Sequence, residues 1–173
     1  MDDIQQRAND LIAKAKALWA NAQWDGNAMH HRRAEQLYDA AMYYTEAAQL
    51  YDPYRTFFLV AGECYLKVGS YGEAEGSFRS LVDFRPNHHQ GWWMLGQAVL
   101  SQNRPNDAES HFDRSIELGS TDVEPYYYGA MVKSLLGKND AVLPLLRKAL
   151  EIQPSWKIQA REESWLRDYV DLL

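Results

Sequence analysis

Apolar positions along most of the chain recur every three or four residues, which is the spacing of amphipathic α-helices. In the middle of the chain the pattern predicts two helices, Phe58–Val68 and Tyr71–Phe84, with Gly69 between them and Pro86 after them. Glycine readily adopts the left-handed conformation that ends a helix, and proline cannot continue one. The sequence therefore predicts a helical hairpin over this stretch.

The hairpin pattern repeats with a period of 34 residues, which is first seen in the aromatic positions Phe58, Trp92 and Tyr126. The other columns of this period are Gly62 with Gly96, Gly69 with Asn103 and Gly137, Ala74 with Ala108, Phe78 with Phe112, and Pro86 with Ser120 and Pro154. Small residues in two of the columns allow the helices of one hairpin to approach closely. Because a single hairpin cannot bury its own apolar face, hairpins of this kind stack into a solenoid.

The order of these columns resembles the tetratricopeptide repeat family. The first unit carries the pattern on Phe58, Gly62, Tyr65, Gly69, Ala74, Phe78 and Pro86. The second unit carries it on Trp92, Leu95, Gly96, Ala108 and Phe112, and the third on Tyr126, Gly137, Ala149 and Pro154. The resemblance implies an all-α fold, a right-handed superhelical solenoid of antiparallel helix hairpins with about nine helices and no sheet.

A single domain of five parts is expected. The parts are an atypical N-terminal helix hairpin (1–53), three repeats (55–88, 89–122 and 123–154) and a C-terminal capping helix (155–173). In the N-terminal hairpin, helices are expected over residues 3–22 and 28–51, with a turn at the WDGN sequence of residues 24–27. The capping helix is expected to cover the open end of the third repeat with Ile158, Trp165, Leu166 and Tyr169.

Composition narrows the class of protein. The net charge of −6 argues against nucleic acid as a partner, because such binding needs an excess of Lys and Arg. No run of 18 apolar residues is present, so no membrane insertion is expected. The N-terminus lacks the basic start and apolar core of a secretory signal, so we expect a cytoplasmic protein.

The residues that could carry catalysis or bind metal do not form a recognisable pattern. Cys64 is the single cysteine and is expected to be a small buried side chain. The histidines at 30–31, 88–89 and 111 lack the spacing of a metal site, and the glycines occur singly rather than in a phosphate-binding loop. We therefore expect no cofactor, no metal and no enzymatic activity.

Candidate partner-binding residues follow from the resemblance, since first helices of tetratricopeptide repeats line a concave channel and contact the ligand at fixed positions. These positions are Leu59, Glu63, Leu66, Gln90, Trp93, Gln97, Leu100, Tyr127 and Met131. The repeat column assigns Trp92 to packing, so Trp93, which faces another way on the same helix, is expected to point into the groove. Burial of this apolar strip between neighbouring helices is the alternative.

The sequence thus favours a protein–protein interaction module that binds a partner polypeptide segment in an apolar concave groove. Residues 51–78 are also similar to bacterial type III secretion chaperones for translocator proteins. That similarity implies a cytoplasmic secretion chaperone as an alternative function. A self-associating scaffold subunit of a larger assembly, such as a homodimer, is the third alternative.

Overall fold

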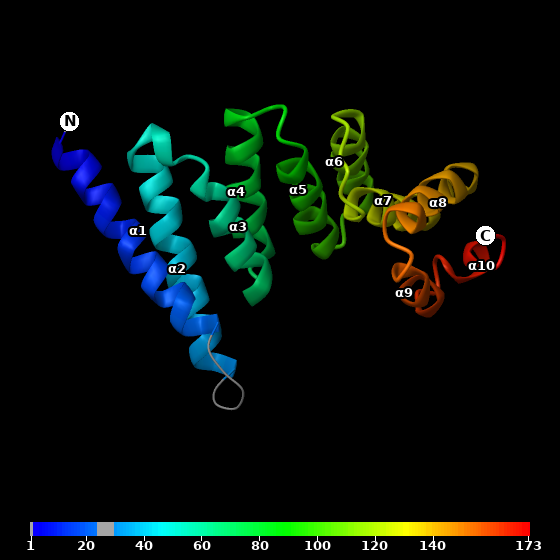
Figure 1. Ribbon diagram of the computed structural model, residues 1–173, viewed down its shortest axis with the longest axis horizontal. Helices are drawn as coiled ribbons and strands as arrows, with labels where there is room; N and C mark the ends of the chain where they lie inside the picture. The colour runs from blue at the N-terminus through cyan, green and yellow to red at the C-terminus, as the bar shows by residue number, and fades with distance from the viewer. Residues whose placement is uncertain (1, 24–29) are drawn as a thin grey trace. The chain divides into compact units, whose positions relative to one another are not determined.

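The computed structural model describes residues 2–23 and 30–173, and the chain divides into two compact units, residues 1–86 and 87–173. Regular structure in the described residues is entirely helical, with ten α-helices, two 3₁₀ helices and no strand (Figure 1). The all-α prediction is confirmed, with ten helices in place of about nine. The expectation of a single domain stays a prediction.

The first unit consists of two successive helical hairpins (Figure 1). Its elements are α1 (Asp2–Gln23), α2 (His30–Leu50), the 3₁₀ helix η1 (Asp52–Tyr54), α3 (Phe57–Val68) and α4 (Tyr71–Phe84). The WDGN sequence expected to form a turn lies outside the described residues. On α1 the buried face is set by Ala8, Ala15 and Ala22, which recur every seventh residue and allow α2 to pack closely.

The α3–α4 hairpin shows why the repeat columns hold the residues they do. Gly69 ends α3 in the left-handed conformation (φ 80°), and its N–H donates to the Leu66 carbonyl at 3.1 Å. Gly62 lies against the fully buried Phe78 ring, and a Cβ at this glycine would be 2.5 Å from a ring carbon. The close approach of the two helices at this point therefore excludes a larger residue.

The second unit continues the hairpins and adds two short helices. Its elements are α5 (His89–Ser101), α6 (Pro105–Glu117), α7 (Glu124–Leu135), the 3₁₀ helix η2 (Asn139–Ala141), α8 (Val142–Ile152), α9 (Trp156–Glu162) and α10 (Arg167–Val170). The repeat column that holds Gly69 in the first unit holds Asn103 (φ 59°) and Gly137 (φ 70°) in the second, and both residues are left-handed. The predicted period therefore extends to backbone conformation.

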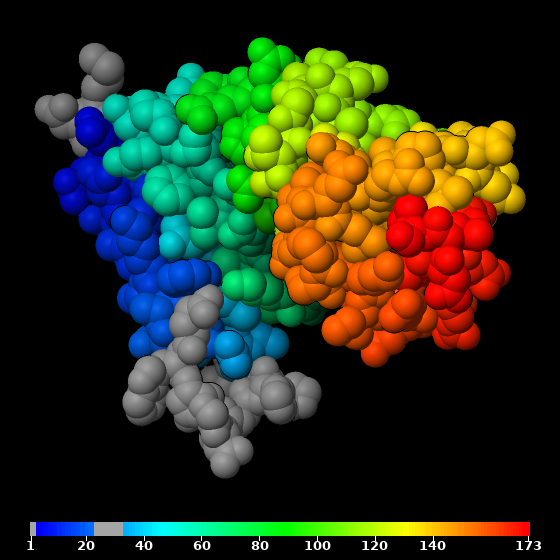
Figure 2. Space-filling model, turned by 45° about the vertical axis from the view of Figure 1, so that its right-hand side comes forward, coloured from blue at the N-terminus to red at the C-terminus, as the bar shows by residue number. Residues whose placement is uncertain are grey.

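The C-terminal segment differs from the single capping helix that the sequence predicts. It forms α9 and α10, separated by an extended Glu163 (ψ 116°). Figure 2 shows this segment, in orange and red, lying against the yellow residues of α8 within the second unit. The side chains that enter the core are Ala160, Leu166 and Val170, whereas Ile158 is 70% exposed and Trp165 is 49% exposed.

Candidate partner-binding site

Three of the predicted contact residues lie along one side of α3 in the first unit. Leu59, Glu63 and Leu66 are spaced by four and three residues, which places them on neighbouring turns of the same helix face. All three are half-buried, so each presents part of its side chain to solvent. The structure thus brings together two leucines with a carboxylate between them.

The carboxylate of Glu63 is poorly solvated. Its partial burial raises the pKa of Glu63, and the nearby charge of Lys67 opposes this change only in part. No ion pair or hydrogen bond of Glu63 is found among the described residues. A partly dehydrated carboxylate gains more from a cationic or hydrogen-bonding partner than one in open water does.

On α5 in the second unit, the predicted contact residues divide into two groups. Gln90, Gln97 and Leu100 are half-buried, but Trp93 is only 7% exposed. The indole Nε1 of Trp93 donates a 3.0 Å hydrogen bond to Asp122, in the connection between α6 and α7. The expectation that Trp93 is an exposed binding anchor is therefore wrong, because the side chain is buried and its indole N–H already has a hydrogen-bond acceptor in Asp122.

The half-buried member of the tryptophan pair is instead Trp92, assigned to packing by its repeat column. Its ring stacks on His111 of α6, with the ring centroids 5.8 Å apart. Both tryptophans therefore pack within the second unit, in agreement with the alternative of burial between helices.

The predicted contact residues of α7 are covered by the C-terminal segment of the chain itself. Tyr127 is 1% exposed, and the ring of Trp156 on α9 meets it edge-on at 4.6 Å. Burial and the nearby Glu163 raise the pKa of the Tyr127 phenol to about 12. Met131 packs against the same core, and the Ser134 hydroxyl donates to the Trp165 carbonyl at 2.6 Å. Tyr127 is therefore a core residue rather than a solvent-facing contact.

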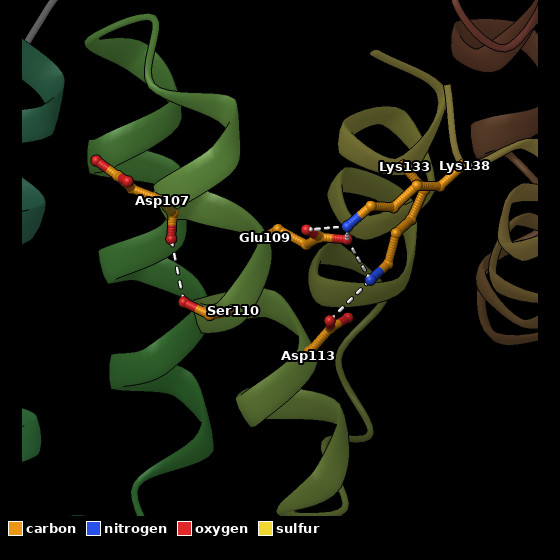
Figure 3. A network of polar contacts seen from close by, with 6 residues as sticks. All are labelled: Asp107, Glu109, Ser110, Asp113, Lys133 and Lys138. Carbon is orange, nitrogen blue, oxygen red and sulfur yellow. Dashed lines mark hydrogen bonds and ion pairs between the residues drawn. The ribbon is translucent and has the colours of Figure 1, made fainter. Parts of the chain in front are cut away.

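A network of charged side chains between α6 and α7 was not predicted (Figure 3). Lys133 donates to Glu109 and to Asp113, each at 2.7 Å, and Lys138 reaches the other oxygen of Glu109 at 2.6 Å. Burial alone would raise the pKa of Glu109, but the hydrogen bonds and charges of the two lysines outweigh burial and lower it. The feature of the sequence that could have indicated this network is Lys133, which stands in the repeat column that holds Tyr65 and Val99 in the earlier repeats.

The lowered pKa of Glu109 keeps its carboxylate ionised, which does not suit it to act as a general acid at neutral pH. Burial likewise raises the pKa of Cys64 to about 11, which leaves its thiol protonated at neutral pH. Among the described residues, no cluster of His, Cys, Asp and Glu could hold a metal ion. Nor does the described part of the chain include a helix long and apolar enough to cross a membrane.

Comparison with known families agrees with the repeat pattern. A sequence model of the tetratricopeptide repeat matches residues 26–89 and 59–123, which together span more than half of the chain. The chain therefore belongs to the tetratricopeptide repeat family, as its sequence predicts. Tetratricopeptide repeats form protein–protein interaction modules.

Solved structures support the fold over most of the chain. A crystal structure of MamA protein aligns with a TM-score of 0.74 at 17% identity, covering 96% of this chain and 87% of that one. A structure of YrrB, described as a TPR protein with an unusual peptide-binding site, aligns with a TM-score of 0.67 at 19% identity. That alignment covers 93% of this chain and 81% of YrrB. At these identities the likeness shows the fold alone.

A human relative matches part of the chain. It is Protein O-mannosyl-transferase TMTC3, which is 28% identical over 87 residues. The match covers 50% of this chain and 10% of that protein, so the chain spans about a tenth of the length of this relative. A similarity of this extent carries no transferase activity over to the present chain.

Proposed function

We propose that the chain binds an extended or helical segment of a partner protein against its first helices, with the Leu59–Glu63–Leu66 face of α3 as the principal contact. The observation that supports this proposal most is the Glu63 carboxylate, which is partly dehydrated and makes no ion pair with the described residues. Two half-buried leucines, one turn away on either side, provide apolar surface next to it. A segment with a Lys or Arg between apolar residues matches this arrangement.

In the second unit, Gln90, Gln97 and Leu100 on α5 are the predicted contacts that stay half-buried without being core residues. Amide side chains of this kind hydrogen-bond the backbone of a bound segment without requiring a particular sequence. We propose them as partner contacts of the second unit, taken by itself. Trp93 and Tyr127 are not part of the proposed contact surface, because both are buried.

The test is a selection of 12-residue peptides from a random displayed library on the full chain, followed by calorimetric titration of the selected sequences. Glu63→Gln keeps the size of the side chain and removes its charge, and we expect it to weaken binding about tenfold, the scale of a hydrogen bond to a charged group. Glu162→Gln, at an exposed site on α9, is the matched control and should leave the affinity unchanged. Equal affinities of the two variants would refute the assignment of Glu63.

A further inference from the structure

The C-terminal segment of the second unit covers part of α7, although its own helices are short. Helix α9 has seven residues and α10 has four, and isolated helices of this length are not stable in water. They are therefore ordered by docking on α7 and α8. We call residues 155–173 the strap.

The buried part of the strap is small. Ala160, Leu166 and Val170 enter the core of the unit, and Trp156 and Tyr169 are partly buried against that core. Because the chain breaks between α9 and α10, these side chains come from two short pieces rather than from one continuous helix face.

The polar contacts of the strap with the rest of the unit are also limited. Ser134 on α7 donates to the Trp165 carbonyl at 2.6 Å, and the Tyr169 hydroxyl donates to Asn139 of η2 at 2.8 Å. Among the described residues, no ion pair joins the strap to α7 or α8. Segments with few buried contacts open more readily than the structure that they cover.

Beneath the strap lies a polar atom without a partner. The hydroxyl of Tyr127 on α7 is buried, and no described residue forms a hydrogen bond with it. The Trp156 ring meets the Tyr127 ring edge-on at 4.6 Å, but an indole offers no hydrogen-bond acceptor. A buried hydroxyl without a hydrogen bond destabilises the state in which it is buried. The closed strap is therefore destabilised at this point.

The preceding repeat shows which group is missing. Trp93 and Asp122 stand 34 residues before Tyr127 and Trp156, respectively, so the two pairs occupy the same positions of the repeat. In the earlier pair, the indole N–H of Trp93 donates to the Asp122 carboxylate at 3.0 Å. In the later pair, a tryptophan stands in place of the carboxylate, and the polar group on the first helix has no partner.

We propose that the strap is an autoinhibitory element, which in its closed state occupies the surface of α7 that a partner segment binds once the strap opens. Opening uncovers Tyr127 and releases the Ser134 hydroxyl from the strap backbone. The partner segment that fits this surface brings an aromatic side chain to the place of Trp156 and a hydrogen-bond acceptor for the Tyr127 hydroxyl. Because it satisfies a group that the strap leaves unpaired, such a segment displaces the strap.

This proposal rests on the proposed function in one respect, since both place a partner segment against the first helices of the repeats. It does not depend on the α3 face, which belongs to the other unit. Variants of the strap and of Glu63 therefore test the two proposals separately.

The first measurement is hydrogen exchange of the full chain, resolved by mass spectrometry. Amides of α9 and α10 should exchange at least tenfold faster than those of α7 and α8, because the strap opens while the hairpin beneath it stays folded. Tyr127→Phe removes the unpaired hydroxyl, so it should close the strap more firmly and slow exchange in α9 about tenfold. Tyr126→Phe is the matched control on the same helix. Its hydroxyl already donates to the Ser120 carbonyl at 3.0 Å, so exchange in α9 should not change.

The second measurement tests whether the covered surface binds a segment in trans. The probe is a fluorescent synthetic peptide with the sequence of residues 155–173, and its anisotropy is measured with the full chain. Leu166→Ala removes a buried side chain of the strap and should bind the probe at least tenfold more tightly than the parent, because its strap is open more often. Ile158→Ala, at a 70% exposed site of the strap, is the matched control and should bind as the parent does.

The chemistry of the partner segment is tested with 12-residue peptides from a displayed library. The peptides are selected for binding to Leu166→Ala and against binding to the parent, so that they require an open strap. If they supply an acceptor to the Tyr127 hydroxyl, they should bind about tenfold more weakly when Tyr127→Phe is added to Leu166→Ala. The strap probe, which has no such acceptor, should not weaken.

Equal exchange rates in α9 and α8, or an unchanged rate in α9 of Tyr127→Phe, would overturn the proposal. Equal binding of the probe to the parent and to Leu166→Ala would also overturn it. Loss of protection in α7 and α8 of Leu166→Ala would show that the strap is only a structural cap. Selected peptides that bind equally with and without Tyr127→Phe would overturn the predicted acceptor. An effect of Glu63→Gln without any of these effects would support the α3 face alone.

Discussion

Replacement of the repeat glycines by alanine should give effects graded by the space at each site. At Gly62 the new Cβ would lie 2.5, 2.6 and 2.8 Å from three atoms of Phe78, which is fully buried. At Gly96 the corresponding distances to Phe112 are 3.0, 3.0 and 3.2 Å, and at Gly129 the nearest atom is 3.6 Å away. The three positions thus cover the range from overlap to ordinary contact.

Two opposing contributions set the expected free energies. Overpacking a tight core costs about 1–3 kcal/mol, while alanine gains about 1 kcal/mol over glycine in a helix interior. Gly62→Ala should therefore lose about 2 kcal/mol, Gly96→Ala should be near neutral, and Gly129→Ala should gain about 0.5–1 kcal/mol. Gly76→Ala, with no neighbour within 4 Å, is the control for helix propensity and should also gain.

The assay is urea unfolding followed by circular dichroism at 222 nm, with the midpoint concentrations of the four variants compared under one set of conditions. The predicted order of midpoints is Gly62→Ala lowest, then Gly96→Ala, with Gly129→Ala and Gly76→Ala highest. A stability of Gly62→Ala equal to that of Gly129→Ala would refute the argument that the contact with Phe78 fixes this column.

Three further predictions concern the second unit. Trp93→Ala should lower the free energy of unfolding by about 3–5 kcal/mol, because it deletes a buried aromatic side chain. Trp92 is half-buried, so thermal unfolding should show a clearly smaller loss of stability for Trp92→Ala. Leu166→Ala should cost about 2–5 kcal/mol, whereas Ile158→Ala should change stability by less than about 0.5 kcal/mol, and equal effects would contradict the observed packing of the C-terminal segment. Lys133→Met should destabilise more than Lys138→Met, because the Lys133 side chain is 14% exposed and that of Lys138 is 53% exposed. The pKa of Glu109 is lowered in the folded protein, so its ion pairs add to the free energy of unfolding above the unfolded pKa of about 4.3. This stabilisation is lost as the pH falls through the folded pKa. The difference in free energy of unfolding between the parent and Lys133→Met should therefore shrink in acid.

Much of the fold follows from the sequence because the repeat pattern is a set of local constraints. Gly62 and Gly69 act through close approach and a left-handed dihedral, and both effects are determined by residues within one hairpin. The same constraints reappear 34 residues later, at Gly96 and Asn103. Periodicity therefore predicted the helices of the α3–α4 hairpin without knowledge of tertiary contacts.

The candidate site was less predictable because exposure depends on residues outside the repeat. Adjacent tryptophans must face different directions, but the pattern does not show that Trp93 is buried with its indole N–H bonded to Asp122. Similarly, Ala160 and Leu166 are six residues apart, which does not place them on one face of a continuous helix. The break at Glu163 redirects the chain so that Leu166 enters the same core as Ala160, while Trp156 of α9 covers Tyr127.

The most direct test of the central claim is an NMR titration of the chain, labelled at its leucine methyl groups, with a peptide selected as described above. The account predicts that the methyl signals of Leu59 and Leu66 shift with saturation, and that Glu63→Gln reduces the affinity while the buried Leu146 stays unperturbed. A peptide that binds without shifting Leu59 or Leu66 would contradict the assignment of the α3 face as the partner-binding surface.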